Sequence, residues 1–152
     1  MNELFAVLLS WAVTLSGFPA PAQMPEVVAV PHAFFVANAC GGNECRVYGW
    51  YAGGRNLYID DRMDPQVNIV DASVVVHEMV HYLQGIARHG GVPLDDATTG
   101  AAFGDKPLCS AAIDMEREAY GVQREFLLRY GVYRPVGMSM ARVSCDEHDH
   151  PQ

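Results

Sequence analysis

Hydrophobic residues recur with the spacing of an α-helix in the middle of the chain, from about residue 71 to residue 87. Asp71 or Ser73 can cap the N-terminus of this predicted helix. Two of its neighbouring stripes are apolar, and they consist of Val75, Met79, Tyr82 and Ile86, and of Val76, Val80, Leu83 and Ala87. A helix that is apolar over so wide an arc is expected to be the buried central helix of the fold.

The pattern before this helix predicts a small β-sheet. Residues 25–30 are expected to form a strand, whereas residues 31–39 fit either a helix or extended chain. Residues 46–51 and 56–60 are short runs rich in β-branched and aromatic residues, and they flank a turn at residues 52–55. This arrangement is typical of a β-hairpin.

The pattern after the central helix predicts a long loop and a second helix. Residues 88–108 are rich in Gly, Asp and Thr, and a loop of this length often forms a rim or lid over a site. The second helix is expected over residues 111–130 and to stop at Gly131. A small twisted sheet followed by two long helices is an α+β domain.

The first residues of the chain have the features of a targeting segment. Leu4 to Phe18 is almost unbroken apolar sequence, and Ala20-Pro21-Ala22 follows it as a small-residue cleavage site. The run is shorter than the roughly 20 apolar residues of a membrane span, although Glu3 stands where a signal peptide usually has Lys or Arg. We therefore expect residues 1–22 to be a signal peptide, with a retained anchor as the alternative, and residues 23–152 to be one secreted or periplasmic domain without a membrane span.

Composition and cysteine content narrow the classes of function. The formal net charge is −8 and Lys106 is the only lysine, so no basic surface for nucleic acid is expected. An even number of cysteines behind a signal peptide indicates two disulfides, with three possible pairings. The short spacing of the first two favours Cys40–Cys45 together with Cys109–Cys145. A zinc ribbon is disfavoured because the chain has no C-x-x-C pair.

The candidate chemistry lies on the central helix, in the sequence His77-Glu78-Met79-Val80-His81. A spacing of four residues places both imidazoles on one helix face, where they can bind one zinc ion. Glu78 is turned by about 100° around the helix, so it can reach a water molecule beside the metal without binding the metal. This is the H-E-x-x-H arrangement of zinc metallopeptidases, with the glutamate as general base.

The motif could also arise by chance, with both histidines as ordinary core or surface residues. Here it lies inside a strongly apolar helix, where a buried polar side chain without a partner is costly. A metal ion and its water supply partners for His77, Glu78 and His81. The metzincin class is disfavoured, because Ala87 occupies the position of its third His and His89 is out of register.

A second motif follows on the later helix. His77-Glu78-x-x-His81 followed by Glu116-x-x-Ala119 resembles the gluzincin metallopeptidases, and the resemblance covers roughly Cys40 to Gln123. The chain also looks like small secreted bacterial zincins with a cysteine pair, a G-W-Y hairpin and an H-E-x-x-H-Y-x-Q helix. The resemblance implies a zincin-like fold and a Zn²⁺ ion held by His77, His81 and Glu116.

Helix geometry separates Glu116 from its neighbour Glu118. Two residues turn a helix by about 200°, so the two carboxylates face opposite ways. The face of Glu116 is mainly apolar and is expected to turn inward, whereas the face of Glu118 is polar and is expected to meet water. Glu116 is therefore the expected third ligand, with a buried arginine or N–H group as its alternative partner.

One position departs from the gluzincin pattern. Gluzincins usually have Asp four residues after the ligand Glu, where it orients the first His, and this chain has Tyr120 there. A phenol lacks the charge of a carboxylate, and changes among such outer partners weaken metal binding or activity by about 10–100-fold. Zinc binding is thus predicted more firmly than fast catalysis. Tyr82, Tyr120 and Tyr133 are candidates to stabilise an oxyanion, although buried tyrosines are usually only packed.

These observations predict a zinc-dependent peptidase that acts on a peptide or protein substrate. Glu78 would accept a proton from water and pass it to the leaving amine. The alternative is a non-catalytic secreted domain that keeps the zinc site for stability or for binding a partner. That alternative leaves Glu78 without a role, because a structural zinc site needs no general base.

Overall fold

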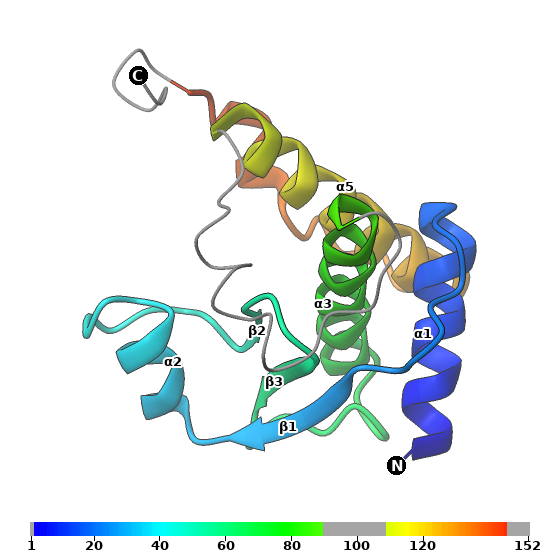
Figure 1. Ribbon diagram of the computed structural model, residues 1–152, viewed down its shortest axis with the longest axis horizontal. Helices are drawn as coiled ribbons and strands as arrows, with labels where there is room; N and C mark the ends of the chain where they lie inside the picture. Colours follow the sequence, from blue (N-terminus) through cyan, green and yellow to red (C-terminus); the bar gives the residue numbers. More distant parts are fainter. Residues whose placement is uncertain (1, 90–108, 146–152) are drawn as a thin grey trace.

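The computed structural model describes residues 2–89 and 109–145 (Figure 1). The helices and strands, in chain order, are α1 (Asn2–Ser16), β1 (Glu26–Val30), α2 (His32–Asn38), β2 (Gly49–Tyr51), β3 (Asn56–Asp60), α3 (Ile69–Arg88), α5 (Cys109–Arg129) and the 3₁₀ helix η1 (Met138–Arg142). The predicted α+β class is confirmed. The predicted loop at residues 88–108 lies almost entirely outside the described residues.

The sheet has three strands in the order β1-β3-β2. The predicted hairpin is confirmed, because β2 and β3 pair antiparallel with Trp50 opposite Tyr58. β1 pairs with β3 in parallel, with Val28 opposite Tyr58. Leu57 and Ile59 of β3 are buried, whereas Tyr58, between them, lies on the opposite face and contacts the ring of Phe34 from α2. Residues 31–39, which fitted two states, thus form mainly a helix beside this outer face.

Helix α3 begins earlier than its predicted caps. Asn68 is the N-cap, and its side chain accepts hydrogen bonds from the backbone N–H groups of Val70 and Asp71. The prediction that Asp71 or Ser73 caps the helix is therefore wrong. The apolar pattern already starts at Ile69 and Val70, and Asn is as good a cap as Asp or Ser.

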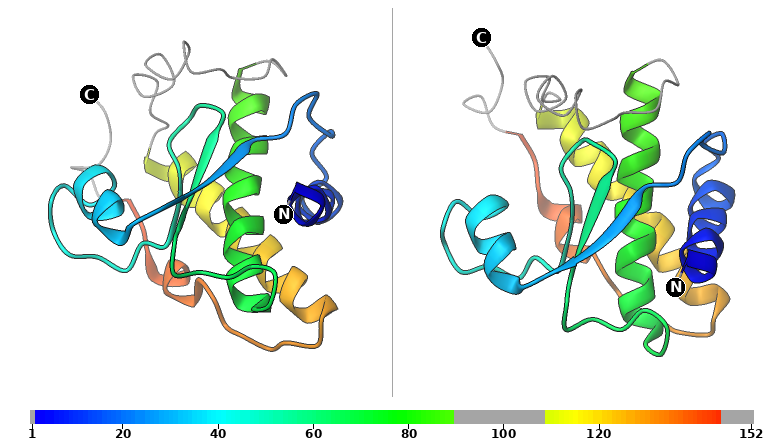
Figure 2. Two further views of the ribbon diagram at one scale, coloured as in Figure 1. Left: turned by 90° about the horizontal axis from the view of Figure 1, so that it is seen from below. Right: turned by 60° about the horizontal axis from the view of Figure 1, so that its bottom comes forward.

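Helix α3 lies at the centre of the molecule, with the sheet on one side and α1 and α5 on the other (Figures 1 and 2). Its two predicted apolar stripes are buried except for Ala87 near the C-terminal end. Because both sides of α3 are covered, apolar residues are needed around most of its circumference. This explains why two stripes rather than one are apolar.

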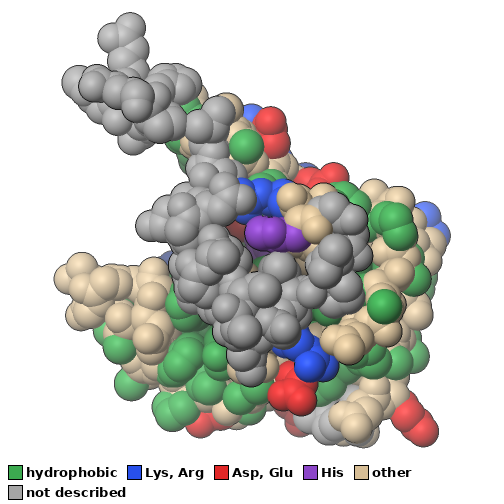
Figure 3. All heavy atoms as spheres, viewed as in Figure 1, with side chains coloured by type: hydrophobic (Ala, Val, Ile, Leu, Met, Phe, Trp, Pro, Cys, Tyr) green, Lys and Arg blue, Asp and Glu red, His purple; other side chains and the backbone are tan. Residues whose placement is uncertain are grey.

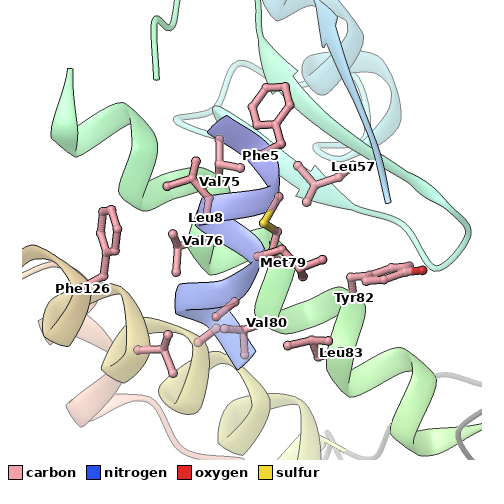
Figure 4. Packing of buried hydrophobic residues seen from close by; sticks show 14 of the residues in the cluster. Phe5, Leu8, Leu57, Val75, Val76, Met79, Val80, Tyr82, Leu83 and Phe126 are labelled. Atoms are coloured by element: carbon pink, nitrogen blue, oxygen red, sulfur yellow. The ribbon is translucent and has the colours of Figure 1, made fainter. Parts of the chain in front are cut away.

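Helix α1 packs into the core. Phe5 and Leu8 belong to the same cluster of buried residues as Val75 and Val76 of α3 (Figure 4). The indole N–H of Trp11 donates a hydrogen bond of 3.1 Å to the hydroxyl of Tyr130, just beyond α5. No helix in the described part of the chain is long and apolar enough to cross a membrane. The apolar run that suggested a signal peptide is thus a packed helix in this structure.

Both predicted disulfides are confirmed: Cys40 is bonded to Cys45 and Cys109 to Cys145. The second bond joins the first residue of α5 to the segment after η1. Crosslinks of this kind stabilise a small domain mainly by restricting its unfolded chain. They are typical of proteins that fold in an oxidising compartment.

The contribution of α1 to stability can be measured with a matched pair of substitutions on the same helix. Leu8 is 2% exposed and Val7 is 50% exposed. Leu8→Ala should lower the free energy of unfolding of the 152-residue chain by about 2–5 kcal/mol. Val7→Ala should change it by less than about 0.5 kcal/mol. Urea titration compares the two, and equal effects would show that α1 does not belong to the cooperative core.

Candidate metal centre

The two histidines of the H-E-x-x-H motif lie one turn apart on α3, and their side chains meet. The Nε2 atoms of His77 and His81 are 3.1 Å apart. Both residues lie among the apolar side chains that pack α3 against its neighbours, and their imidazoles are only 9% and 14% exposed. Two ring nitrogens that face each other at this distance need a proton or a cation between them.

Glu116 of α5 contacts both imidazoles. Its Oε1 atom lies 3.5 Å from Nε2 of His77 and still closer to Nε2 of His81. The predicted orientation of α5 is confirmed, because the Ile113, Ala119, Gln123 and Leu127 face is buried. Glu118 is exposed, and neither histidine forms an ion pair with it in the described part of the chain.

Two of the three separations among these atoms suit a small cation. Ligands arranged tetrahedrally at about 2.0–2.1 Å from zinc lie about 3.4 Å from one another. The separations of 3.1 Å between the two Nε2 atoms and 3.5 Å between Nε2 of His77 and Oε1 of Glu116 fall on either side of that value. The carboxylate lies much closer to Nε2 of His81, so it would have to move away from this imidazole to admit an ion. The residues of this group could therefore hold a metal ion, and the ligand atoms of His77, Glu78 and His81 all lie within 4.8 Å of one another.

A chain of hydrogen bonds determines the tautomer of His77. The hydroxyl of Ser73 donates to the carbonyl of Val70 over 2.6 Å, so its oxygen accepts from Nε2 of Gln123 over 3.0 Å. The amide nitrogen of Gln123 is thus directed at Ser73 and its Oε1 faces Nδ1 of His77 at 3.0 Å. Because that oxygen can only accept, Nδ1 of His77 carries a proton and Nε2 is left to face Glu116.

A second glutamine orients His81 in the same way. Nε2 of Gln84 donates to the carbonyl of Met115 at 3.0 Å and to the carboxylate of Glu118 at 2.8 Å. Its Oε1 therefore accepts from Nδ1 of His81 at 2.7 Å. Nε2 of His81 is directed at Glu116, as Nε2 of His77 is. Glu118 is not simply a solvated residue, as its helix face suggested, because it fixes the glutamine behind His81.

The charges at the metal-free site are balanced by protons. Burial lowers the pKa of His81, but hydrogen bonding to Glu116 and the charge of Glu78 outweigh this effect and raise the pKa to about 9. Burial raises the pKa of Glu116, but hydrogen bonds from both histidines outweigh it and leave the pKa well below its usual value. A proton shared between His81 and Glu116 thus occupies the place that a cation would take.

Glu78 lies beside this group without binding to it. Burial raises its pKa, and among the described residues its Oε2 atom has no hydrogen-bond partner. Gly49 of β2 lies against it, because a Cβ at that position would be 3.1 Å from Cγ of Glu78 and 2.9 Å from Cγ1 of Val74. The absence of a side chain at Gly49 therefore lets the strand approach the carboxyl group closely.

Of the three tyrosines considered from the sequence, one lies at the site. The ring of Tyr120 packs on His77 with centroids 4.4 Å apart. The hydroxyl of Tyr82 instead donates to the backbone of Gln23, and Tyr133 is 84% exposed. Tyr120 does not bond to Nδ1 of His77, where gluzincins place a carboxylate, because Gln123 occupies that place.

The structure thus brings together all four residues predicted from the motifs: His77, Glu78, His81 and Glu116. Histidine side-chain atoms are visible near the middle of the face in Figure 3. Gln84 and Gln123 were not predicted to orient the histidines. The sequence could have indicated this role, because both glutamines lie on inward helix faces, where a buried amide group needs hydrogen-bond partners.

The site has to be interpreted from its own geometry. Comparison of the chain with protein-family models, with curated proteins and with solved structures finds no match.

Glu116→Ala should weaken zinc binding by more than about 100-fold, because loss of a ligand costs more than loss of an outer partner. Glu118→Ala should weaken it by about tenfold or less, since Gln84 keeps its bond to the carbonyl of Met115. Glu125→Ala, which removes only a surface pair with Arg129, is the control. Competition with a chromophoric chelator measures all three affinities, and a stronger effect of Glu118→Ala than of Glu116→Ala would contradict the assignment.

Metal binding should also depend on pH. The pKa of His81 is raised to about 9, so at pH 7 the metal-free site holds a proton that the metal must displace. The affinity should therefore rise with pH between 6 and 9, with about one proton released per metal ion at pH 7. Calorimetry in buffers of different ionisation enthalpy counts this proton. An affinity that is constant over the range would show that His81 is neutral in the metal-free chain.

Proposed function

We propose that this protein is a zinc-dependent peptidase that hydrolyses peptide bonds, with Glu78 as the general base. The observation that carries the proposal is the convergence of two imidazole Nε2 atoms and one carboxylate, beside a buried carboxyl group with an oxygen that has no hydrogen-bond partner among the described residues. The resemblance of His77-Glu78-x-x-His81 and Glu116-x-x-Ala119 to gluzincins, and hence a zincin-like fold, agrees with this reading.

The donor set is one of those found at catalytic zinc sites, and it is shared with non-haem iron(II) sites. Two imidazoles and one carboxylate suit zinc, and three protein ligands leave one position open for a catalytic water or substrate. A structural site would be closed by a fourth protein ligand. His77, His81 and Glu116 would hold the ion, and Gln123 and Gln84 would keep the two Nε2 lone pairs directed at it.

Each residue of the site then has a defined part in the proposed hydrolysis. A zinc ion held by His77, His81 and Glu116 would supply Lewis-acid activation of a water molecule and of the scissile carbonyl group. Glu78 accepts a proton from the attacking water and returns it to the leaving nitrogen. Among the described residues the Oε2 atom of Glu78 has no hydrogen-bond partner, so this oxygen would be available to exchange the proton.

An extended peptide has a natural place beside this carboxyl group. In the three-stranded sheet, β2 is an edge strand, and Gly49 of this strand lies against Glu78. An edge strand can pair with the backbone of an extended peptide, and the closeness of Gly49 brings such a peptide next to the general base. The two disulfides agree with a secreted or periplasmic location for this activity.

Glu78→Gln separates catalysis from metal binding. The substitution keeps the shape of the side chain but removes the base, so turnover should fall by about 10²–10⁴-fold or more. Zinc content should stay at that of the parent protein, because Glu78 is not a ligand in this mechanism. Digestion of a broad peptide library, with metal analysis of both proteins, makes the test. Zinc binding without cleavage by the parent protein would support a non-catalytic zinc domain instead.

A further inference from the structure

A second group of polar side chains lies next to the metal centre, on the adjoining face of α5. Arg117, Tyr120 and Arg124 follow one another at spacings of three and four residues, which places them on one helix face. Together with η1 they line a cavity of about 260 Å³, whose other lining residues are Gly137, Met138, Met140 and Ala141. Tyr120 belongs to both sites, because its ring also packs on His77.

The two arginines are held in place by backbone carbonyl groups. Nε and Nη2 of Arg117 donate to the carbonyl of Met140 at 3.1 and 3.0 Å, and Nη2 also donates to that of Val143 at 2.8 Å. Nη1 of Arg124 donates to the carbonyl of Val136 at 2.8 Å. These bonds use only part of each guanidinium, which has five N–H donors. Nη1 of Arg117 and Nε and Nη2 of Arg124 form no hydrogen bond with the described residues and could donate to a ligand.

Among the residues that the structure describes, no carboxylate balances the charge of this cavity. Within residues 2–89 and 109–145, no carboxylate forms an ion pair with Arg117 or Arg124. The lining contains two cationic side chains and no acidic one, in a chain whose net charge is −8. Paired guanidinium groups with free donors are the usual recognition element for a carboxylate.

The wall opposite α5 is fixed in position. Gly137 lies so close to Tyr120 that a Cβ there would be 2.1 Å from Cγ of the ring, and its φ of 73° suits glycine. The Cys109–Cys145 disulfide joins the end of this segment to the start of α5. The cavity is therefore preorganised, so that little ordering free energy is spent when a ligand enters.

We propose that this cavity binds a carboxylate group of the peptide substrate while the scissile bond lies at His77, His81 and Glu116. The inference rests on the proposed peptidase function and names its substrate class. The carboxylate is either the C-terminus of the peptide or the side chain of an Asp or Glu residue close to the scissile bond. Tyr120, between the arginines and His77, places the two sites within the span of one peptide.

Binding of matched peptides to the zinc-loaded Glu78→Gln protein tests the proposal without hydrolysis. Fluorescent peptides with a free C-terminus or an internal Glu are compared with the same peptides carrying a C-terminal amide or Gln. The carboxylate form should bind about 10- to 100-fold more tightly. Whether the free C-terminus or the internal Glu confers the preference identifies the source of the carboxylate. Equal affinity for all four peptides would overturn the proposal.

Substitution of the arginines then locates the preference. Arg117→Gln combined with Arg124→Gln should abolish the ratio between acid and amide peptides, whereas Arg134→Gln, at an exposed residue outside the cavity, should keep it. A merely structural role of the arginines would weaken all peptides equally and lower the melting temperature. A ratio preserved in the double variant would overturn the proposal.

Hydrolysis of the same peptides by the parent protein is measured separately. Cleavage with no preference for a carboxylate would overturn the subsite and leave the peptidase proposal standing. Arginine-dependent binding of carboxylate peptides without any cleavage would overturn the peptidase proposal and leave a carboxylate-binding site. The two proposals thus fail in different ways.

Discussion

Three ionisable side chains on a helix that crosses the centre of the domain are the constraint on which the rest of the structure depends. Helix α3 is buried from both sides, yet it carries His77, Glu78 and His81. Each of these groups would destabilise the fold without a partner. Glu116 supplies charge to the two histidines from a neighbouring helix. Among the described residues Glu78 has one oxygen without a hydrogen-bond partner, and this costly arrangement agrees with the proposed role of Glu78 as a general base.

The amide partners of the histidines follow from the same constraint. A carboxylate at position 123 would hold His77 more strongly, but it would add a negative charge close to the buried Glu78. Like charges in a buried site raise each other's pKa, and the pKa of Glu78 is already raised by burial. Gln123 and Gln84 fix the imidazole tautomers without that charge. On α5 it is thus Gln123 that holds Nδ1 of His77, whereas Tyr120, about one turn earlier, packs on the imidazole ring.

Features with a regular period or a fixed spacing could be predicted from the sequence. The hairpin, both long helices, the inward face of Glu116 and the two disulfides belong to this class. The role of Gln123 could not be predicted from the sequence. Its partners His77 and Ser73 lie 46 and 50 residues away along the chain, and no motif marks a buried amide. The first residues pose a different difficulty, because a signal peptide and a packed helix such as α1 share the same apolar pattern.

Helix α5 links these requirements because it makes three sets of contacts around its circumference. Glu116 and Gln123 reach the histidines, Phe126 packs against Trp11 of α1, and Arg117 and Arg124 hold the backbone of the segment around η1. In so small a domain no separate element is available for each task. A rotation of α5 that relaxed one set of contacts would disturb the others, since they share one rigid axis. The orientation of Glu116 toward the histidines is thus determined by packing on the other faces of α5, and not only by the attraction between their charges.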